Sequence, residues 1–209
     1  MKYIVFDLEF NQPFDFKEGD KTFLDPRIPF EIIQIGAVKL DEDMKIVDQK
    51  SFMIRPQIYK RLHPYVEKMT GFKMEQLETG EPFQEAFQAF QDFIGKGGYV
   101  LCIWGDYDIH ALYKNVFYYD LYDDSLSRRF INVQKAASIT LGYGGGAPIG
   151  LQKAVQAMDI SIDGAFHDAL NDALYTAKIF QLIRRKHAPV EKVKAKQIKR
   201  IKEDSKCSG

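Results

Sequence analysis

Cysteine is nearly absent from this 209-residue chain: Cys102 lies within an apolar run, and Cys207 lies near the polar C-terminus. Two cysteines in such places form neither a disulfide framework nor the paired spacing of a structural zinc site. Long apolar runs are also missing, since none approaches the roughly 20 residues that span a bilayer, and the N-terminus lacks the regions of a secretory signal. We therefore expect a cytoplasmic protein that does not enter a membrane.

Net charge is absent as well, because 29 Lys and Arg residues balance 29 Asp and Glu residues. The balance is uneven along the chain: residues 184–209 carry ten basic and three acidic side chains, a net charge of +7, and residues 1–183 carry −7. An acidic body with a basic end is one pattern of nucleic-acid enzymes, in which metal ions reverse the local field. A solubilising tail is the alternative.

The length of the chain fits one domain with a single core. Apolar content falls near Lys186, so we predict a domain over residues 1–185 and a basic C-terminal tail over 186–209. The expected strands are residues 2–10, 31–41, 45–56 and 98–108, and the expected helices are 64–71, 83–95, 109–119, 151–160 and 167–186, with a short strand leading into a helix over 130–142. A meander followed by strands that alternate with helices indicates an α/β fold with a mixed sheet.

Two acids follow each other at alternate positions in the first strand, Asp7 and Glu9 of YIVFDLEF. Side chains in a strand alternate between faces, so both carboxylates point the same way. Like charges at this separation repel unless a cation lies between them, which favours a divalent metal. Solvated acids, or acids paired with Lys, are the alternative.

A third acid follows a later apolar strand, in WGDYDIHAL. Asp108 stands where a helix begins, and ligands of α/β sheets gather outside the carboxyl ends of strands, so it can meet the first two acids in one crevice. Asp106 lies on the same strand face if the strand continues, and it is the rival for this role.

The fourth group is in the segment FHDALNDALYTAKIF. An apolar stripe packs this helix on the sheet, formed by Ala169, Leu170, Ala173, Leu174 and Ala177. Asp168 and Asp172 are one helical turn apart, and His167 stands at the helix start. A histidine there is often structural, but its position before two acids favours a functional role.

Together these residues resemble the three exonuclease motifs of the DEDDh family: Asp7-x-Glu9, Tyr107-Asp108 and His167-x-Ala169-x-x-Asp172. The resemblance covers most of residues 1–185, and the ordered trio is specific. The segments DLEF and WGDYD are similar to the corresponding segments of the short-RNA branch of the family, which includes KapD and the enhanced-RNAi exonucleases. The resemblance implies an RNase H-like fold, a mixed five-stranded sheet flanked by helices, and it favours Asp108 over Asp106.

The resemblance also implies a mechanism that suits these residue types. Asp7, Glu9, Asp108 and Asp172 offer hard oxygen ligands for two Mg²⁺ or Mn²⁺ ions about 3.5 to 4 Å apart, with Asp7 bridging both ions. His167 would be the general base, a task for a side chain that titrates near neutral pH. The activity would be 3′–5′ exonuclease hydrolysis of single-stranded nucleic acid to nucleoside 5′-monophosphates, with RNA favoured by the branch.

In the family the segment around the Asp-x-Glu pair lines the pocket of the 3′-terminal nucleotide, so Phe10 and Leu8 are the candidates, with Phe10 stacking on the last base. Leu8 points away from both acids and is expected to be buried, and a core role for Phe10 is the alternative. The partners would be single-stranded RNA or DNA 3′ ends. A DNA exonuclease, a dinucleotide hydrolase and a non-catalytic nucleic-acid-binding module remain as other functions.

Overall fold

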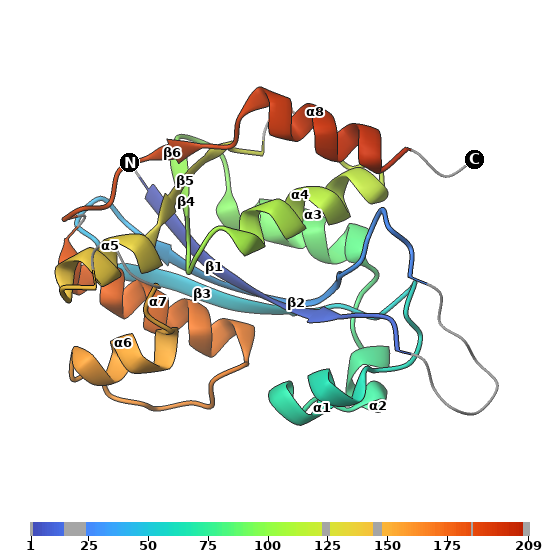
Figure 1. Cartoon of the computed structure of the whole chain (residues 1–209), viewed down its shortest axis with the longest axis horizontal. Coiled ribbons are helices and arrows are strands. Elements are labelled where there is room, and N and C mark those ends of the chain that lie inside the picture. Colours follow the sequence, from blue (N-terminus) through green and yellow to red (C-terminus); the bar gives the residue numbers. More distant parts are fainter. Residues whose placement is uncertain (1, 15–23, 123–125, 144–147, 185, 207–209) are drawn as a thin grey trace.

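Strand β1 (Lys2–Asn11) lies at the centre of a six-stranded mixed sheet with the order β3-β2-β1-β4-β5-β6 (Figure 1). The computed structural model describes residues 2–14, 24–122, 126–143, 148–184 and 186–206. The other strands are β2 (Glu31–Leu40), β3 (Ile46–Met53), β4 (Tyr99–Ile103), β5 (Arg129–Asn132) and β6 (Glu191–Lys192). The first three strands form the predicted antiparallel meander, and β4 and β5 run parallel to β1. The predicted α/β mixed sheet is confirmed, with one strand more than the five expected.

Helices cover both faces of the sheet (Figure 1). The apolar core on one face includes residues of α5, α6 and α7, and the core on the other includes residues of α3, α4 and α8. The helices are α1 (Pro64–Thr70), α2 (Met74–Glu78), α3 (Phe83–Ile94), α4 (Tyr107–Tyr118), α5 (Val133–Thr140), α6 (Leu151–Ala157), α7 (Ala169–Ile183) and α8 (Ala195–Asp204). None of those helices in the described ranges is long and apolar enough to cross a membrane.

The alternation of β1 decides where its acids lie. Ile4, Phe6 and Leu8 are buried in the core beneath α3 and α4, whereas Tyr3 and Val5 are buried in the core beneath α7. Continuing the period of two places the side chains of residues 7 and 9 on the α7 face. The sequence of one strand therefore directs apolar groups to both layers and the two acids to the helix that carries residue 172.

The extra strand comes from the segment predicted to be a basic tail. β6 pairs antiparallel with β5, and α8 buries Ile198 and Ile201 in the same core as Tyr113 and Phe117 of α4. The basic helix is amphipathic, and its apolar stripe explains why it docks rather than remaining solvated. The domain boundary at residue 185 stays a prediction, and the described part of 186–206 packs on the same sheet as the rest.

Candidate active site

A shift in the pairing of β1 with β2 lies at the first part of the site. Asp7 lies opposite Gly36 and Glu9 opposite Gln34 of β2, but the register shifts between Glu9 and Phe10. Ile33 of β2 is the extra residue at this shift, so two residues of β2 lie opposite the end of β1. Here Glu9 and Phe10 both line one pocket.

The first turn of α7 lies directly on β2 because residue 36 is glycine. A Cβ atom added to Gly36 would lie 2.0 Å from the carbonyl carbon of Ala169 and 2.2 Å from the backbone nitrogen of Leu170. These distances are far inside van der Waals contact and the atoms belong to the backbone, so no other residue fits without moving the helix. This close approach brings the first turn of α7, which carries Asp172, next to Gly36, the residue of β2 that pairs with Asp7.

A buried amide fixes the turn that precedes α7. The Gln34 side chain donates to Asp168 Oδ2 at 3.0 Å and to the Ser51 hydroxyl at 3.0 Å, and its oxygen accepts from the Ala169 backbone N–H at 2.9 Å. Asp168 also caps the helix, since its Oδ1 accepts from the Asn171 N–H at 3.0 Å. Every polar atom of the Gln34 side chain is used in holding this turn.

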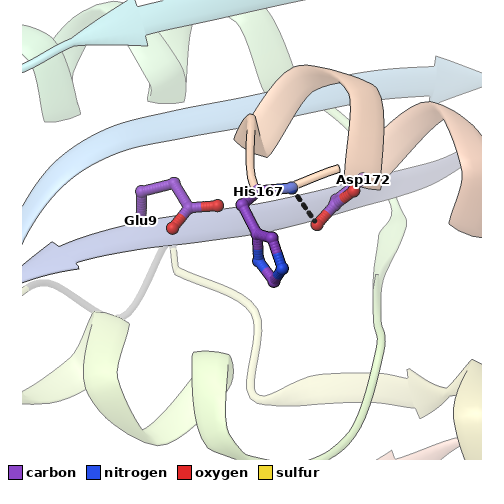
Figure 2. A group of neighbouring side chains, drawn as sticks. All are labelled: Glu9, His167 and Asp172. Atoms are coloured by element: carbon purple, nitrogen blue, oxygen red, sulfur yellow. Dashed lines mark hydrogen bonds between the residues drawn. The ribbon is translucent and has the colours of Figure 1, made fainter. Parts of the chain in front are cut away.

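His167 lies between two carboxylates (Figure 2). Its backbone is left-handed, with φ of 65°, and its N–H donates to Asp172 Oδ2 at 3.2 Å. Glu9, His167 and Asp172 each offer one ligand atom, and these atoms lie within 4.8 Å of one another. The exposed imidazole is therefore free to meet a substrate while its backbone is tied to an acid of the site.

Asp108 is the third acid of the cluster. It is 8% exposed in the first turn of α4, and its charge raises the pKa of both Asp7 and Glu9. Asp106 is exposed just before the helix, and its carboxylate accepts a hydrogen bond from the Asn132 side chain at 2.8 Å. β4 ends at Ile103, so the strand does not continue to align the two acids.

Burial raises the pKa of all four carboxylates, and repulsion from neighbouring acids raises it further. Burial is the larger cause in each case. The pKa of Asp7 lies well above its usual range, that of Glu9 rises to about 8 and that of Asp108 to about 7. The pKa of Asp172 rises only to about 6, because the His167 N–H stabilises its charged form.

This group of acids fits a divalent cation. Across the residues that the structure describes, no Lys or Arg forms an ion pair with any of the four. Asp172 Oδ1 is buried and has no hydrogen-bond partner in the described part of the chain, which leaves an acceptor that only a donor or a cation can satisfy. Hard carboxylate oxygens at this density are the ligands that Mg²⁺ and Mn²⁺ prefer.

An aromatic pocket of about 320 Å³ opens beside Glu9 and His167. Phe10, Phe30 and Tyr107 pack edge to face, with ring centroids 5.6 to 6.2 Å apart, and α1 adds Tyr65 and Met69 to the wall. The predicted candidate Phe10 lines this pocket. Leu8 is 4% exposed in the core on the opposite strand face, so its side chain offers no surface to a substrate.

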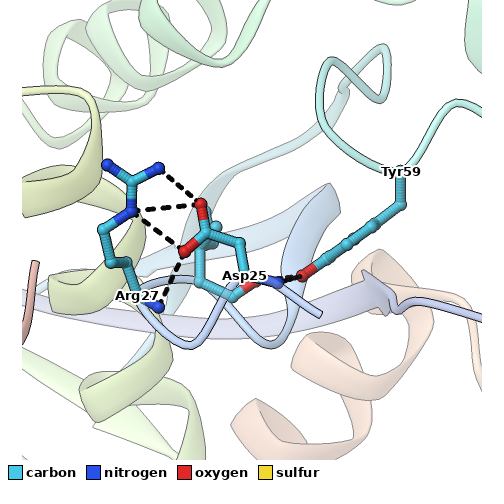
Figure 3. A network of polar contacts seen from close by, with 4 residues as sticks. Asp25, Arg27 and Tyr59 are labelled. Carbon is cyan, nitrogen blue, oxygen red and sulfur yellow. Dashed lines mark hydrogen bonds and ion pairs between the residues drawn. The ribbon is translucent and has the colours of Figure 1, made fainter. Parts of the chain in front are cut away.

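The loop that carries Phe30 is held by its own network (Figure 3). The Asp25 carboxylate accepts from the Arg27 guanidinium at 2.6 to 3.1 Å. The Tyr59 hydroxyl donates to the Ile28 carbonyl at 2.9 Å and accepts from the Asp25 N–H at 3.2 Å. One wall of the pocket is thus fixed by contacts that do not involve the acids.

A family model described as an exonuclease matches residues 4–180. The chain belongs to this exonuclease family. A curated relative, the probable 3′-5′ exonuclease KapD of Bacillus subtilis (strain 168), is 25% identical over 193 residues, which cover 91% of this chain and 88% of the relative. The predicted DEDDh 3′–5′ exonuclease family, and with it an enzyme that hydrolyses nucleic acid, is confirmed. Enzymes of this family depend on divalent metal ions.

Solved structures agree in fold. The nuclease domain of 3′hExo, a DEDDh family member bound to rAMP, matches with a TM-score of 0.75 and 19% identity, over 92% of this chain and 97% of that chain. E. coli exonuclease I in complex with a dT13 oligonucleotide matches with a TM-score of 0.65 and 16% identity, over 89% of this chain and 41% of that chain. This exonuclease chain spans less than half the length of exonuclease I.

Four features of the site were not predicted from the sequence: the roles of Gln34, Gly36 and Tyr107, and the shift in strand pairing after Glu9. Gln34 and Gly36 lie in a run that indicates a buried strand, and the sequence marks Tyr107 only as the aromatic before Asp108. A glycine inside a strand is a known sign of close backbone approach, and a glutamine in an apolar run has amide groups to satisfy. Those two signals point to the helix contact, whereas nothing in the local sequence marks the shift in pairing after Glu9.

Replacing Gly36 by alanine tests the close approach of α7. We expect Gly36→Ala to lower the free energy of unfolding by about 3 kcal/mol, the upper end for an overpacked site, and to reduce activity by about 10²-fold. Urea unfolding and the initial rate of strand hydrolysis at saturating Mn²⁺ would measure the two losses. Gly98→Ala is the matched control, because a Cβ atom there meets no atom within 4 Å. Equal behaviour of the two variants would contradict the role of Gly36.

The raised pKa values predict how stability depends on pH without metal. Between pH 4 and 8 the folded protein holds protons that the unfolded chain releases, so stability decreases as pH rises through the pKa of about 8 at Glu9. In EDTA, Glu9→Gln should gain thermal stability over the wild type from pH 5 to pH 8. Saturating Mg²⁺ should remove most of this gain. A melting-temperature difference that stays constant with pH would contradict the prediction.

Proposed function

We propose that this exonuclease hydrolyses single-stranded nucleic acid from the 3′ end in a two-metal reaction, with RNA as the preferred substrate and nucleoside 5′-monophosphates as products. The main support for this function is the arrangement of the acids, the histidine and the pocket. Four carboxylates without a cationic partner in the described residues stand beside an exposed histidine, and an aromatic pocket opens next to them. The negative charge suits metal ions, which would in turn bind the phosphate, and the pocket suits a base.

The four acids would hold the ions. Asp7 would hold the ions together with the other three acids, since the charges of Asp108, Asp172 and Glu9 all raise its pKa. When bound, two Mg²⁺ or Mn²⁺ ions would neutralise the phosphodiester and lower the pKa of the attacking water. The protein contributes the fixed positions: α7 is held by Gly36 and Gln34, and β1 is held in the sheet.

His167 would accept the proton of the attacking water. Its side chain is exposed between Glu9 and Asp172, with no hydrogen bond from its ring in the described residues. The hydrogen bond from its backbone to Asp172 ties the base to a metal ligand, so both move together. This arrangement supports general-base catalysis, in which geometry is the first requirement.

The 3′-terminal nucleotide would enter the aromatic pocket. Phe10 and the half-exposed Tyr107 offer ring faces and edges for a base, and a cavity of 320 Å³ suits one nucleotide. RNA is the favoured substrate because the sequences of the motifs resemble those of the short-RNA branch. The matched structures were solved with rAMP in one case and with dT13 in another, so a DNA exonuclease is the second candidate.

Two other readings predict different behaviour. A dinucleotide hydrolase would act on a few nucleotides and leave longer strands intact. A non-catalytic binding module would lack one of the carboxylates, and all of Asp7, Glu9, Asp108 and Asp172 are present. A cytoplasmic location stays a prediction.

Digestion of 5′-labelled single-stranded RNA and DNA of equal sequence tests the proposed function. With Mg²⁺ or Mn²⁺ we expect a ladder that shortens from the 3′ end, faster on RNA, and no ladder in EDTA or with Asp7→Ala. A faster ladder on DNA would reassign the substrate. Cleavage of dinucleotides alone would establish the small-substrate hydrolase, and no hydrolysis by a folded, metal-binding protein would refute catalysis.

His167→Ala tests the general base. We expect the turnover rate to decrease by about 10² to 10⁴-fold, the usual contribution of such a group, while the affinities for Mn²⁺ and for the strand stay near those of the wild type. Single-turnover rates and fluorescence anisotropy measure the two quantities separately. Turnover equal to that of the wild type would remove His167 from the mechanism.

A further inference from the structure

A second cavity lies on the other side of His167. It has a volume of about 330 Å³ and is lined by residues 150–153 at the start of α6 and by Phe166, His167 and Asp172. The Phe166 ring is half-buried and packs on the Tyr175 ring, with centroids 4.8 Å apart. This cavity is as large as the aromatic pocket, and neither the proposed ligand set nor the terminal nucleotide accounts for it.

The two cavities meet at the carboxylates. The aromatic pocket includes Glu9 and His167, whereas the second cavity includes His167 and Asp172. The ligand atoms of these three residues lie within 4.8 Å of one another, and Figure 2 shows the imidazole between the two acids. A phosphate held by metal ions at these acids would therefore have one cavity on each side.

We propose that the second cavity binds the nucleotide on the 5′ side of the scissile bond, and that Lys153 contacts the phosphate of that nucleotide. The inference rests on the proposed function, because a phosphodiester joins two nucleosides and the aromatic pocket takes the terminal one. Lys153 is exposed on α6 and supplies the positive charge that a strand backbone requires. Leu151 and Phe166 supply apolar surface for the base or sugar.

A small cavity at α4 is the alternative site for the upstream part of the nucleic-acid strand. It measures about 60 Å³, and it is lined by Phe30, Tyr107 and Lys114, among others. It shares Phe30 and Tyr107 with the aromatic pocket but includes none of the four acids, so it lies behind the pocket wall rather than across the scissile bond. Lys114 is therefore the matched control for Lys153.

Two substrates distinguish the contribution of the second cavity from that of the aromatic pocket. A single-stranded oligonucleotide has a nucleotide on each side of the cleaved bond, whereas the p-nitrophenyl ester of a nucleoside 5′-monophosphate has p-nitrophenol in place of the upstream nucleotide. We expect Lys153→Ala to lower kcat/KM on the oligonucleotide by about tenfold, to reduce the salt slope of strand binding by about one, and to leave the ester unchanged. Lys153→Arg should keep wild-type values, and Lys114→Ala should change neither substrate.

An inhibition measurement, which does not need turnover of the ester, also tests whether Lys153 acts on the terminal nucleotide. The inhibition constant of a nucleoside 5′-monophosphate, which fills only the terminal pocket, should be equal in the wild type and Lys153→Ala. A loss on the oligonucleotide with Lys114→Ala instead, an equal loss of monophosphate affinity, or no loss with Lys153→Ala would overturn the inference. A wild type that degrades no strand would refute the proposed function itself, which distinguishes the two failures.

Discussion

Repulsion among Asp7, Glu9, Asp108 and Asp172 is the interaction that the rest of the site must withstand. Each carboxylate is brought into a region where burial already penalises its charge, and its neighbours add to the penalty. The acids cannot hold themselves together, so other contacts must do so. The apolar layers on both faces of the sheet, the contact at Gly36 and the amide of Gln34 supply them. A cation that binds the acids relieves the repulsion and stabilises the fold at the same time.

Charge and shape are supplied by different parts of the chain. The acids come from β1 and from the first turns of α4 and α7, which are rigid elements packed on the sheet. The pocket walls come from the loop that carries Phe30 and from α1. The network around Tyr59 holds the loop in place, and α1 is held by its own N-cap. The substrate surface can therefore change without moving the groups that bear charge.

Much of this arrangement was predictable from local patterns. The period of two in YIVFDLEF places Asp7 and Glu9 on one face, and the apolar stripe that follows His167 places Asp172 on a helix against the sheet. The shift in pairing after Glu9, the register of Gly36 with Asp7 and the docking of α8 depend on pairings between distant segments. Spacing along the chain carries no information about them, because tertiary packing selects them.

The ends of the sheet carry a consequence for assembly. A strand at a sheet edge offers unpaired backbone groups to a strand of another molecule, and short or charged edge strands oppose such pairing. In the described residues, one edge of the sheet is β6, with only two residues, and the other is β3, where Asp48 and Lys50 are exposed. The C-terminal segment, by covering β5, leaves a strand at that edge that is too short to be a good template, and the charges on β3 oppose pairing at the other edge.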